Sequence, residues 1–185
     1  RKAFRNLAIS MGADGDTIVK ELREVSKETV STTELIGSAS RAMLLGIQPE
    51  KLTKLMEIAR AASKATGDTI SKSFDDITLG IGRNSKMILD NLGIIIRVDE
   101  ANQKYAETLG KSSAELTDTE KKQAFLNATL EAGQVIINNV GKDSLSARDK
   151  LERFKVKITE TKEQMALFAA TVFEDVEPAL TKLIS

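Results

Sequence analysis

The residues that most resemble a chemical motif are Leu-Gly-Lys-Ser-Ser at 109–113, because Gly-Lys-Ser is how a phosphate-binding loop ends. That loop also needs a glycine five positions before the glycine that precedes lysine, and Tyr105 stands there. It needs a buried strand before the loop as well, whereas the apolar spacing of 101–109 is that of a helix. We therefore interpret Gly110 as a helix end, followed by a polar link to a helix cap at Thr117.

Two other glycine-containing stretches are incomplete motifs. Gly80-Ile-Gly82 begins like a dinucleotide fingerprint, but Ser85 occupies the third glycine position. Asp14-Gly-Asp16 could open a calcium loop, but Ile18 stands where its fifth position needs an oxygen ligand. We interpret the first as a helix end and the second as a turn that caps a helix beginning near Thr17.

The chain contains no histidine and no cysteine. An ordinary zinc site, a Ser-His-Asp triad and a Cys-His dyad are therefore excluded. The acidic pairs are interpreted as solvated faces and caps; they are Asp75-Asp76, Asp99-Glu100 and Glu174-Asp175. We predict no catalytic, cofactor-binding or metal-binding residue and no enzyme, and a lytic enzyme acting through a lone glutamate is the weakest alternative.

Charge and hydropathy exclude two further classes. Lys and Arg number 27, as do Asp and Glu, so the net charge is zero and the basic excess of a nucleic-acid-binding protein is missing. The longest charge-free stretches, 132–141 and 164–173, are half of the roughly 20 apolar residues that a membrane span needs. We predict neither specific nucleic-acid binding nor a membrane span.

Helical periodicity dominates the elements that would position any site. A stripe of apolar residues is predicted to be the buried face of a helix from Pro49 to Gly67; it consists of Leu52, Leu55, Met56, Ala59 and Ala62. Asp68 is expected to cap the following helix, whose predicted face is Ile70, Phe74, Ile77 and Ile81. Upstream, either Ser31 or Thr32 is predicted to open a helix.

The β-branched run at 93–98 could be a strand, and we predict a connector that inserts into a helical bundle instead, because an isolated strand is only marginally stable. Thr117 and Glu120 have the spacing of a capping box. The helix that they begin is predicted to end near Gly141 and to bury a face made of Phe125, Ala128, Ala132 and Ile136.

A long C-terminal helix is predicted, with Asp143 or Ser144 as its cap. Its apolar residues alternate three and four apart, which suits a coiled-coil seam or the buried face of a bundle helix; they are Leu151, Phe154, Ile158, Thr161, Met165, Phe168 and Val172. Pro178 is expected to break or kink the helix near 174–177. The fold is therefore predicted to be all-α, a bundle of short amphipathic helices with a long C-terminal helix. With no clear repeat or linker we expect one domain over 1–185, and the start at Arg1 suggests a fragment of a longer chain.

The order of these segments resembles the shared helical region of tail tape measure proteins of long-tailed bacteriophages and prophages, over about residues 30–185. The most specific part is NLGI at 91–94 followed by YAETLGKSSAELTDTEKKQAFLNATLEAG at 105–133. The resemblance carries no catalytic residues, only structural positions: Leu92, Gly93, Ile94, Tyr105, Leu109, Gly110, Lys111, Leu116 and Thr117.

The resemblance implies a non-enzymatic structural segment that contributes to tail assembly and tail-length determination. Expected partners are tail tube subunits, tail chaperones and tail-tip or baseplate proteins, and self-association is left open. The expected location is the virion tail, after synthesis in the bacterial cytoplasm from a phage or prophage genome. The alternative is a compact docking or ejection module that contacts the tail tip or host envelope, because the helix breaks near Gly46–Pro49 and Gly67 suit a bundle better than a rod.

Overall fold

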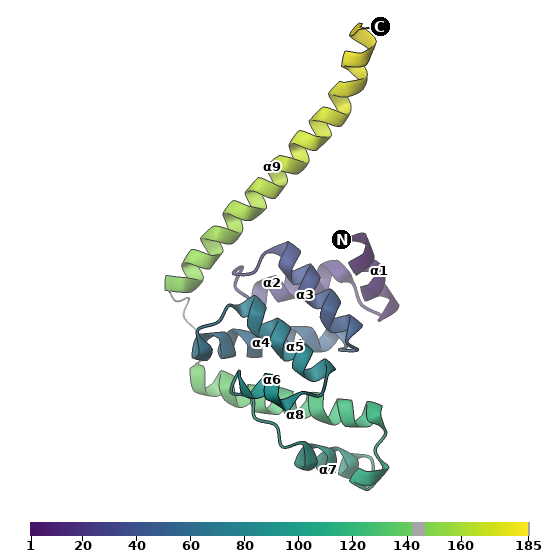
Figure 1. Ribbon diagram of the computed structural model, residues 1–185, viewed down its shortest axis with the longest axis vertical. Helices are drawn as coiled ribbons and strands as arrows, with labels where there is room; N and C mark the ends of the chain where they lie inside the picture. The colour runs from purple at the N-terminus through teal and green to yellow at the C-terminus, as the bar shows by residue number, and fades with distance from the viewer. Residues whose placement is uncertain (142–146, 185) are drawn as a thin grey trace. The chain divides into compact units, whose positions relative to one another are not determined.

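The structure is a computed structural model that describes residues 1–141 and 147–184, with side chains at 1–141 and 148–170. Over the described residues the chain forms nine α-helices, one short 3-10 turn and no strand (Figure 1). The predicted all-α class is confirmed. The chain divides into two units, Arg1–Ser144 and Leu145–Ser185, which are described separately. The expectation of a single domain stays a prediction.

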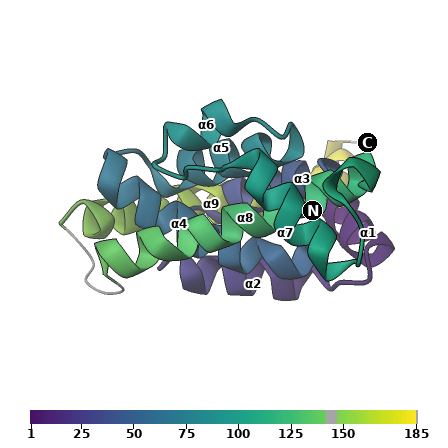
Figure 2. The same cartoon turned by 90° about the horizontal axis from the view of Figure 1, so that it is seen from below.

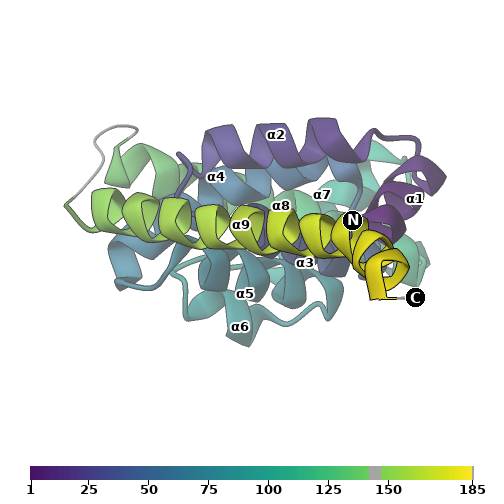
Figure 3. The ribbon, with the colours of Figure 1, turned by 90° about the horizontal axis from the view of Figure 1, so that it is seen from above.

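The first unit is built around one central helix, α4 (Pro49–Thr66), which packs against α2, α3, α5 and α8. Figures 2 and 3 show α2 and α6 at opposite edges of this unit. Its other elements are α1 (Lys2–Ser10), α2 (Gly15–Val25), α3 (Thr32–Leu44), α5 (Ile70–Gly82), α6 (Lys86–Asp90), α7 (Val98–Thr108), the 3-10 turn η1 (Ser113–Glu115) and α8 (Asp118–Val140).

The sequence predicts α4 closely. Pro49 is its first residue and Gly67 ends it in the left-handed conformation, with φ of 80°. All five residues of the predicted stripe are buried, and so are Ile58 and Ala61 beside it. The buried face is wider than a single stripe because neighbours cover α4 on several sides.

The cap of α5 differs from the prediction. Thr69, not Asp68, is the cap residue, and its hydroxyl accepts the N–H of Lys72 at 3.1 Å. Asp68 instead accepts the ammonium group of Lys72 at 3.0 Å. Both residue types cap helices well, and Thr69 is the one that lies directly before the first helical turn. The predicted apolar face of α5 is buried as expected.

The segment before α7 is a connector, as predicted. Residues 93–97 are neither helix nor strand in the structure. Ile94 and Ile96 are buried, whereas Ile95 between them is 72 % exposed. The alternation arises because an extended chain directs successive side chains to opposite sides. Two isoleucines thereby anchor the connector to the core of the first unit.

The predicted capping box at the start of α8 is present, and the structure adds a second box at the start of α3. Ser31 rather than Thr32 opens α3, with Glu34 as its partner, and Thr117 opens α8 with Glu120. In α8 the predicted face is only partly buried beyond Phe125. The most buried positions of this helix are instead Ala124, Phe125, Leu126, Thr129, Gly133 and Ile137. The buried face is shifted because α4 and α7 both pack against α8.

The second unit contains α9 (Ala147–Ile184), a helix of 38 residues. It continues through Pro178, so the predicted break there is wrong, while the kink given as the other outcome stays a prediction. One proline removes a single backbone hydrogen bond, and the helix extends far enough on its N-terminal side to tolerate that loss. The predicted caps Asp143 and Ser144 lie outside the described residues.

The predicted stripe of α9 is exposed as far as its side chains are described. Exposed fractions range from 41 % for Ile158 to 72 % for Phe168, and Leu151, Phe154 and Met165 lie between. The side chain of Val172 lies outside the described set. Over the residues that the structure covers, no helix has both the length and the apolar composition that crossing a bilayer requires.

Candidate functional site

The nine signature residues occupy two places in the first unit. Leu92, Gly93 and Ile94 follow the end of α6, while 105–117 covers the end of α7 and the start of α8. We call the second place, residues 105–120, the α7–α8 corner. Because the quoted resemblance depends mainly on this corner, we treat it as the candidate site.

Three helices of the first unit end in the same way. In each, a Leu-Gly pair follows the helix, the glycine has a positive φ, and the next residue donates its N–H to a carbonyl five positions earlier. These are the bonds of a Schellman motif, which favours glycine at the left-handed position. The donors and acceptors are Ile47 to Ala42 at 3.1 Å, Ile94 to Leu89 at 3.0 Å, and Lys111 to Ala106 at 3.0 Å.

The residue after the glycine distinguishes the third ending from the other two. Ile47 and Ile94 are buried, as expected for the apolar contact that often accompanies this motif. Lys111 takes the same position at the end of α7 and is exposed. Its side chain therefore leaves the helix end and is available to bind a group on the next element.

That group is Glu120 in the first turn of α8. The Lys111 ammonium donates to Glu120 Oε1 at 2.7 Å. The other carboxylate oxygen accepts from the backbone N–H of Thr117 at 2.7 Å and from its hydroxyl at 2.9 Å. In return the Thr117 hydroxyl accepts the N–H of Glu120 at 3.2 Å. One carboxylate thus joins the end of α7 to the start of α8.

The hydrogen bonds set the protonation states of the corner. The ammonium of Lys111, followed by the N–H and hydroxyl of Thr117, lowers the pKa of Glu120 to about 2. The same contact raises the pKa of Lys111. Glu115 has a lowered pKa because the N–H and hydroxyl of Ser112 both donate to its carboxylate at 2.8 Å. These groups are charged and hydrogen-bonded at neutral pH.

The amide groups of Leu-Gly-Lys-Ser are used inside the chain. Leu109 and Lys111 donate to the Ala106 carbonyl, Gly110 donates to Glu107, and Ser112 donates to Glu115. A phosphate-binding loop needs such N–H groups directed at the ligand. Here all four have acceptors in the protein, and Lys111 holds a carboxylate. The observed corner agrees with the predicted helix end, polar link and cap.

Two further signature residues, Leu116 and Tyr105, lie in the link and beside a neighbouring groove. Leu116 is 4 % exposed, so the link buries one apolar side chain. Tyr105 lies on a groove of about 450 Å³ between α7 and α8, whose floor includes Ala101, Ala124 and Ala128. Lys104 crosses this groove to both carboxylate oxygens of Glu131, each at 2.8 Å. This ion pair across the groove joins α7 to α8.

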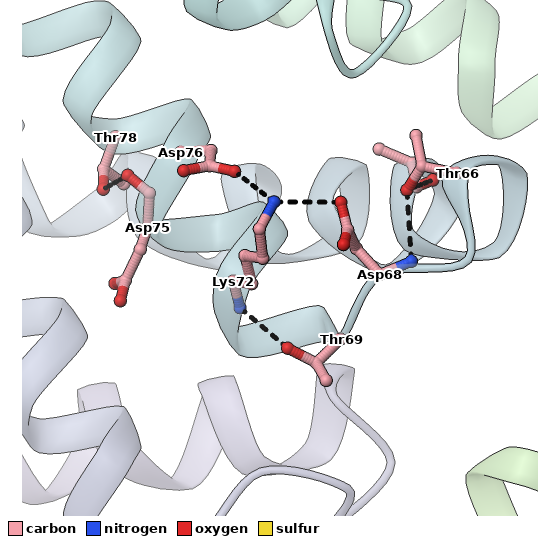
Figure 4. A network of polar contacts seen from close by, with 8 residues as sticks. Thr66, Asp68, Thr69, Lys72, Asp75, Asp76 and Thr78 are labelled. Carbon is pink, nitrogen blue, oxygen red and sulfur yellow. Dashed lines mark hydrogen bonds and ion pairs between the residues drawn. The ribbon is translucent and has the colours of Figure 1, made fainter.

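A second polar cluster lies at the turn from α4 to α5, shown in Figure 4. Lys72 donates to Asp68 and to Asp76, each at 3.0 Å, and these two contacts raise its pKa. The neighbouring Asp75 accepts from Arg41 of α3 at 2.6 Å. The acidic pair Asp75-Asp76 is thus divided between two cations. Across the described residues, no group of three or more acidic side chains could hold a metal ion.

A comparison of the sequence with models of known protein families finds no match, and no solved structure matches the chain. The resemblance to tape measure proteins therefore stays a prediction. Sequence reasoning missed two features of the site: the common ending of α3, α6 and α7, and the bond from Lys111 to Glu120. The first has a partial signal, because Leu-Gly recurs at 45–46, 92–93 and 109–110, although it also occurs at 79–80 inside α5.

Proposed function

We propose that this chain is a non-enzymatic structural segment of a phage tail tape measure protein, contributing to tail assembly and tail-length determination. The proposal is supported most by the structural roles of the signature residues. They end α6 and α7, cap α8, and join α7 to α8 through the bond from Lys111 to Glu120. This is a role in shaping a helical chain, as a structural segment requires.

The proposed location is the virion tail, reached after synthesis in the cytoplasm of the bacterial host from a phage or prophage genome. The proposed partners are tail tube subunits, tail chaperones and tail-tip or baseplate proteins. A tape measure protein occupies the tail until it is expelled ahead of the DNA. The chain should therefore be part of filled particles and leave them on ejection.

Mass spectrometry of purified particles tests this proposal. Peptides from 1–185 are expected in filled virions and are expected to be strongly depleted in particles that have ejected their DNA. A tail tube subunit, quantified in the same samples, is the control that must stay constant. Absence of the peptides from filled particles, or retention at full level after ejection, would contradict the proposal.

The second candidate is a compact docking or ejection module that contacts the tail tip or host envelope. The observation that favours it is the first unit, in which helices α1 to α6 and α8 contribute to one buried core. Such a unit presents surfaces of fixed shape, which suits docking. Light scattering and small-angle X-ray scattering on the purified chain separate the two: a compact monomer favours the module, and a long self-associated rod favours the ruler.

A further inference from the structure

The exposed stripe of α9 has the spacing of a coiled-coil seam. Residues 151, 158 and 165 occupy the a positions of a heptad, and 154, 161 and 168 occupy the d positions. Five of these six residues are large and apolar, and all five are exposed by at least 41 %. We call these six positions the α9 seam. An apolar seam of this length on a helix is typical of a surface that binds another helix.

The flanks of the α9 seam are basic. Positions e and g, which border a seam and face the flanks of a partner helix, are 150, 155, 157, 162 and 164 over this stretch. Four of them are lysines and the fifth is a glutamine: Lys150, Lys155, Lys157, Lys162 and Gln164. Acidic residues of the same stretch occupy the outer positions instead, and Glu152 pairs there with Lys155 at 3.0 Å.

This charge pattern opposes pairing with a second copy. In a parallel pair each g position faces the e position five residues further along the other helix. Lys150 would face Lys155 of the second copy, and Lys157 would face Lys162. In an antiparallel pair the e positions face each other, as do the g positions, so lysine again meets lysine. Like charges at these positions disfavour the complex.

From the seam and its flanks we infer that α9 binds a helix of another protein, with apolar residues three and four apart and Asp or Glu on both flanks. Opposite charges at e and g set partner choice in coiled coils. An anionic lipid surface would also attract lysines, but a helix that lies in a bilayer surface needs a broad apolar face. Over 150–162 the lysines stand directly beside the a and d positions, so the apolar face is only two heptad positions wide there.

Binding of the full chain to two defined peptides tests the inference. Both peptides have three heptads with Leu and Ile at a and d; one has Glu at all e and g positions and the other has Lys. Fluorescence anisotropy at low salt should give a Kd at least about tenfold lower for the Glu peptide. The difference should narrow as salt screens the charges. Equal affinity for the two peptides, or no binding of the Glu peptide, would overturn the inference.

A charge-reversed variant sharpens the test. Changing Lys150, Lys155, Lys157 and Lys162 to Glu should reverse the preference, so that the Lys peptide binds more tightly. A matched control carries the same charge change on exposed lysines of the first unit: Lys2, Lys20, Lys86 and Lys122 to Glu. This control should keep the original preference, and circular dichroism checks that both variants stay helical.

Two further measurements test whether the α9 seam binds a second copy of the chain or a lipid surface instead. Analytical ultracentrifugation should show that the unmodified chain does not dimerise through the α9 seam. Any dimer that is seen should persist after the Phe154→Ala change. Vesicles of phosphatidylcholine and phosphatidylserine should bind the chain more weakly than the Glu peptide does. A dimer that depends on Phe154, or tighter binding to the vesicles, would contradict the inference. The peptide comparison on the unmodified chain decides the matter even where a variant misfolds.

Discussion

At the scale of single residues, the α7–α8 corner depends on one carboxylate. Glu120 accepts hydrogen bonds from the ammonium of Lys111 and from both donors of Thr117. Its side chain is 21 % exposed, so water reaches the group and the energy of each contact is modest. What the arrangement provides is geometry: the end of α7 and the start of α8 share a single acceptor.

The stability of the chain should therefore depend on pH through Glu120. Its pKa in the folded protein is about 2, against an ordinary value of 4.5. A lowered pKa means that the carboxylate stabilises the fold above about pH 4.5 and that this contribution is lost as the pH falls toward 2. Urea unfolding should show Glu120→Gln less stable than the unmodified chain at pH 7, with the difference vanishing near pH 2.

Asp118→Asn is the matched control for that measurement. Asp118 lies in the same first turn of α8 and shares its interaction with the helix dipole. It does not belong to the cluster of Lys111, Thr117 and Glu120. If Asp118→Asn lowers the free energy of unfolding as much as Glu120→Gln, with the same pH dependence, the effect comes from the helix dipole. That result would contradict the proposed role of the corner.

A second residue-scale prediction concerns Gly133 in α8. A Cβ atom added there would lie 2.6 Å from Cγ1 and 2.7 Å from Cγ2 of Ile58, which is fully buried in α4. Gly133→Ala should therefore destabilise the chain by about 1–3 kcal/mol, as overpacking does. Gly37→Ala is the control, since its Cβ would meet only the Arg41 side chain, at 3.4 Å. Gly37→Ala should stabilise the chain by up to about 1 kcal/mol, because alanine has a higher helix propensity than glycine. Urea unfolding measures both variants. Equal effects of the two substitutions would contradict the close approach of Gly133 to Ile58.

At the scale of elements, the connector between α6 and α7 gives a clear prediction. Ile94 is fully buried and the adjacent Ile95 is 72 % exposed. Ile94→Ala should lower the free energy of unfolding by about 2–5 kcal/mol, whereas Ile95→Ala should change it by less than about 0.5 kcal/mol. Thermal and urea unfolding measure both. Similar losses for the two variants would mean that the connector does not insert into the core as described.

Local signals explain which elements the sequence predicts well. Pro49 and Gly67 bound α4, and the Thr117 box opens α8, because these residues act within one turn of the helix end. Where two good caps adjoin, as with Asp68 and Thr69, local sequence cannot choose between them. The break expected at Pro178 did not occur. The low helix propensity of this one residue is outweighed by the long helix on its N-terminal side.

Features that depend on tertiary contacts could not be predicted. The approach of Gly133 to Ile58 joins two helices far apart in the sequence, and periodicity within α8 does not indicate it. The same holds for the bond from Lys111 to Glu120, which requires the link between them to fold back. At the candidate site, the sequence thus predicts the helix end and the cap, and the structure adds the contact that joins them.

At the scale of the whole molecule, the two units would contribute differently to tail length under the proposed function. A folded bundle such as the first unit adds little length per residue. The single helix α9 has 38 residues and, at about 1.5 Å per residue, extends for about 57 Å. If this segment contributes to tail length as proposed, α9 is the part of the described chain that contributes most per residue.

Tail length is therefore the measurement that tests the proposed function most directly. If a phage or prophage encodes the chain as proposed, an in-frame deletion of 147–184 there should give tails shorter by up to about 57 Å in negative-stain electron micrographs, at about 1.5 Å per deleted residue. Replacing the same residues with an unrelated helix of equal length should restore the original tail length. Well-assembled tails of unchanged length after the deletion would contradict the account.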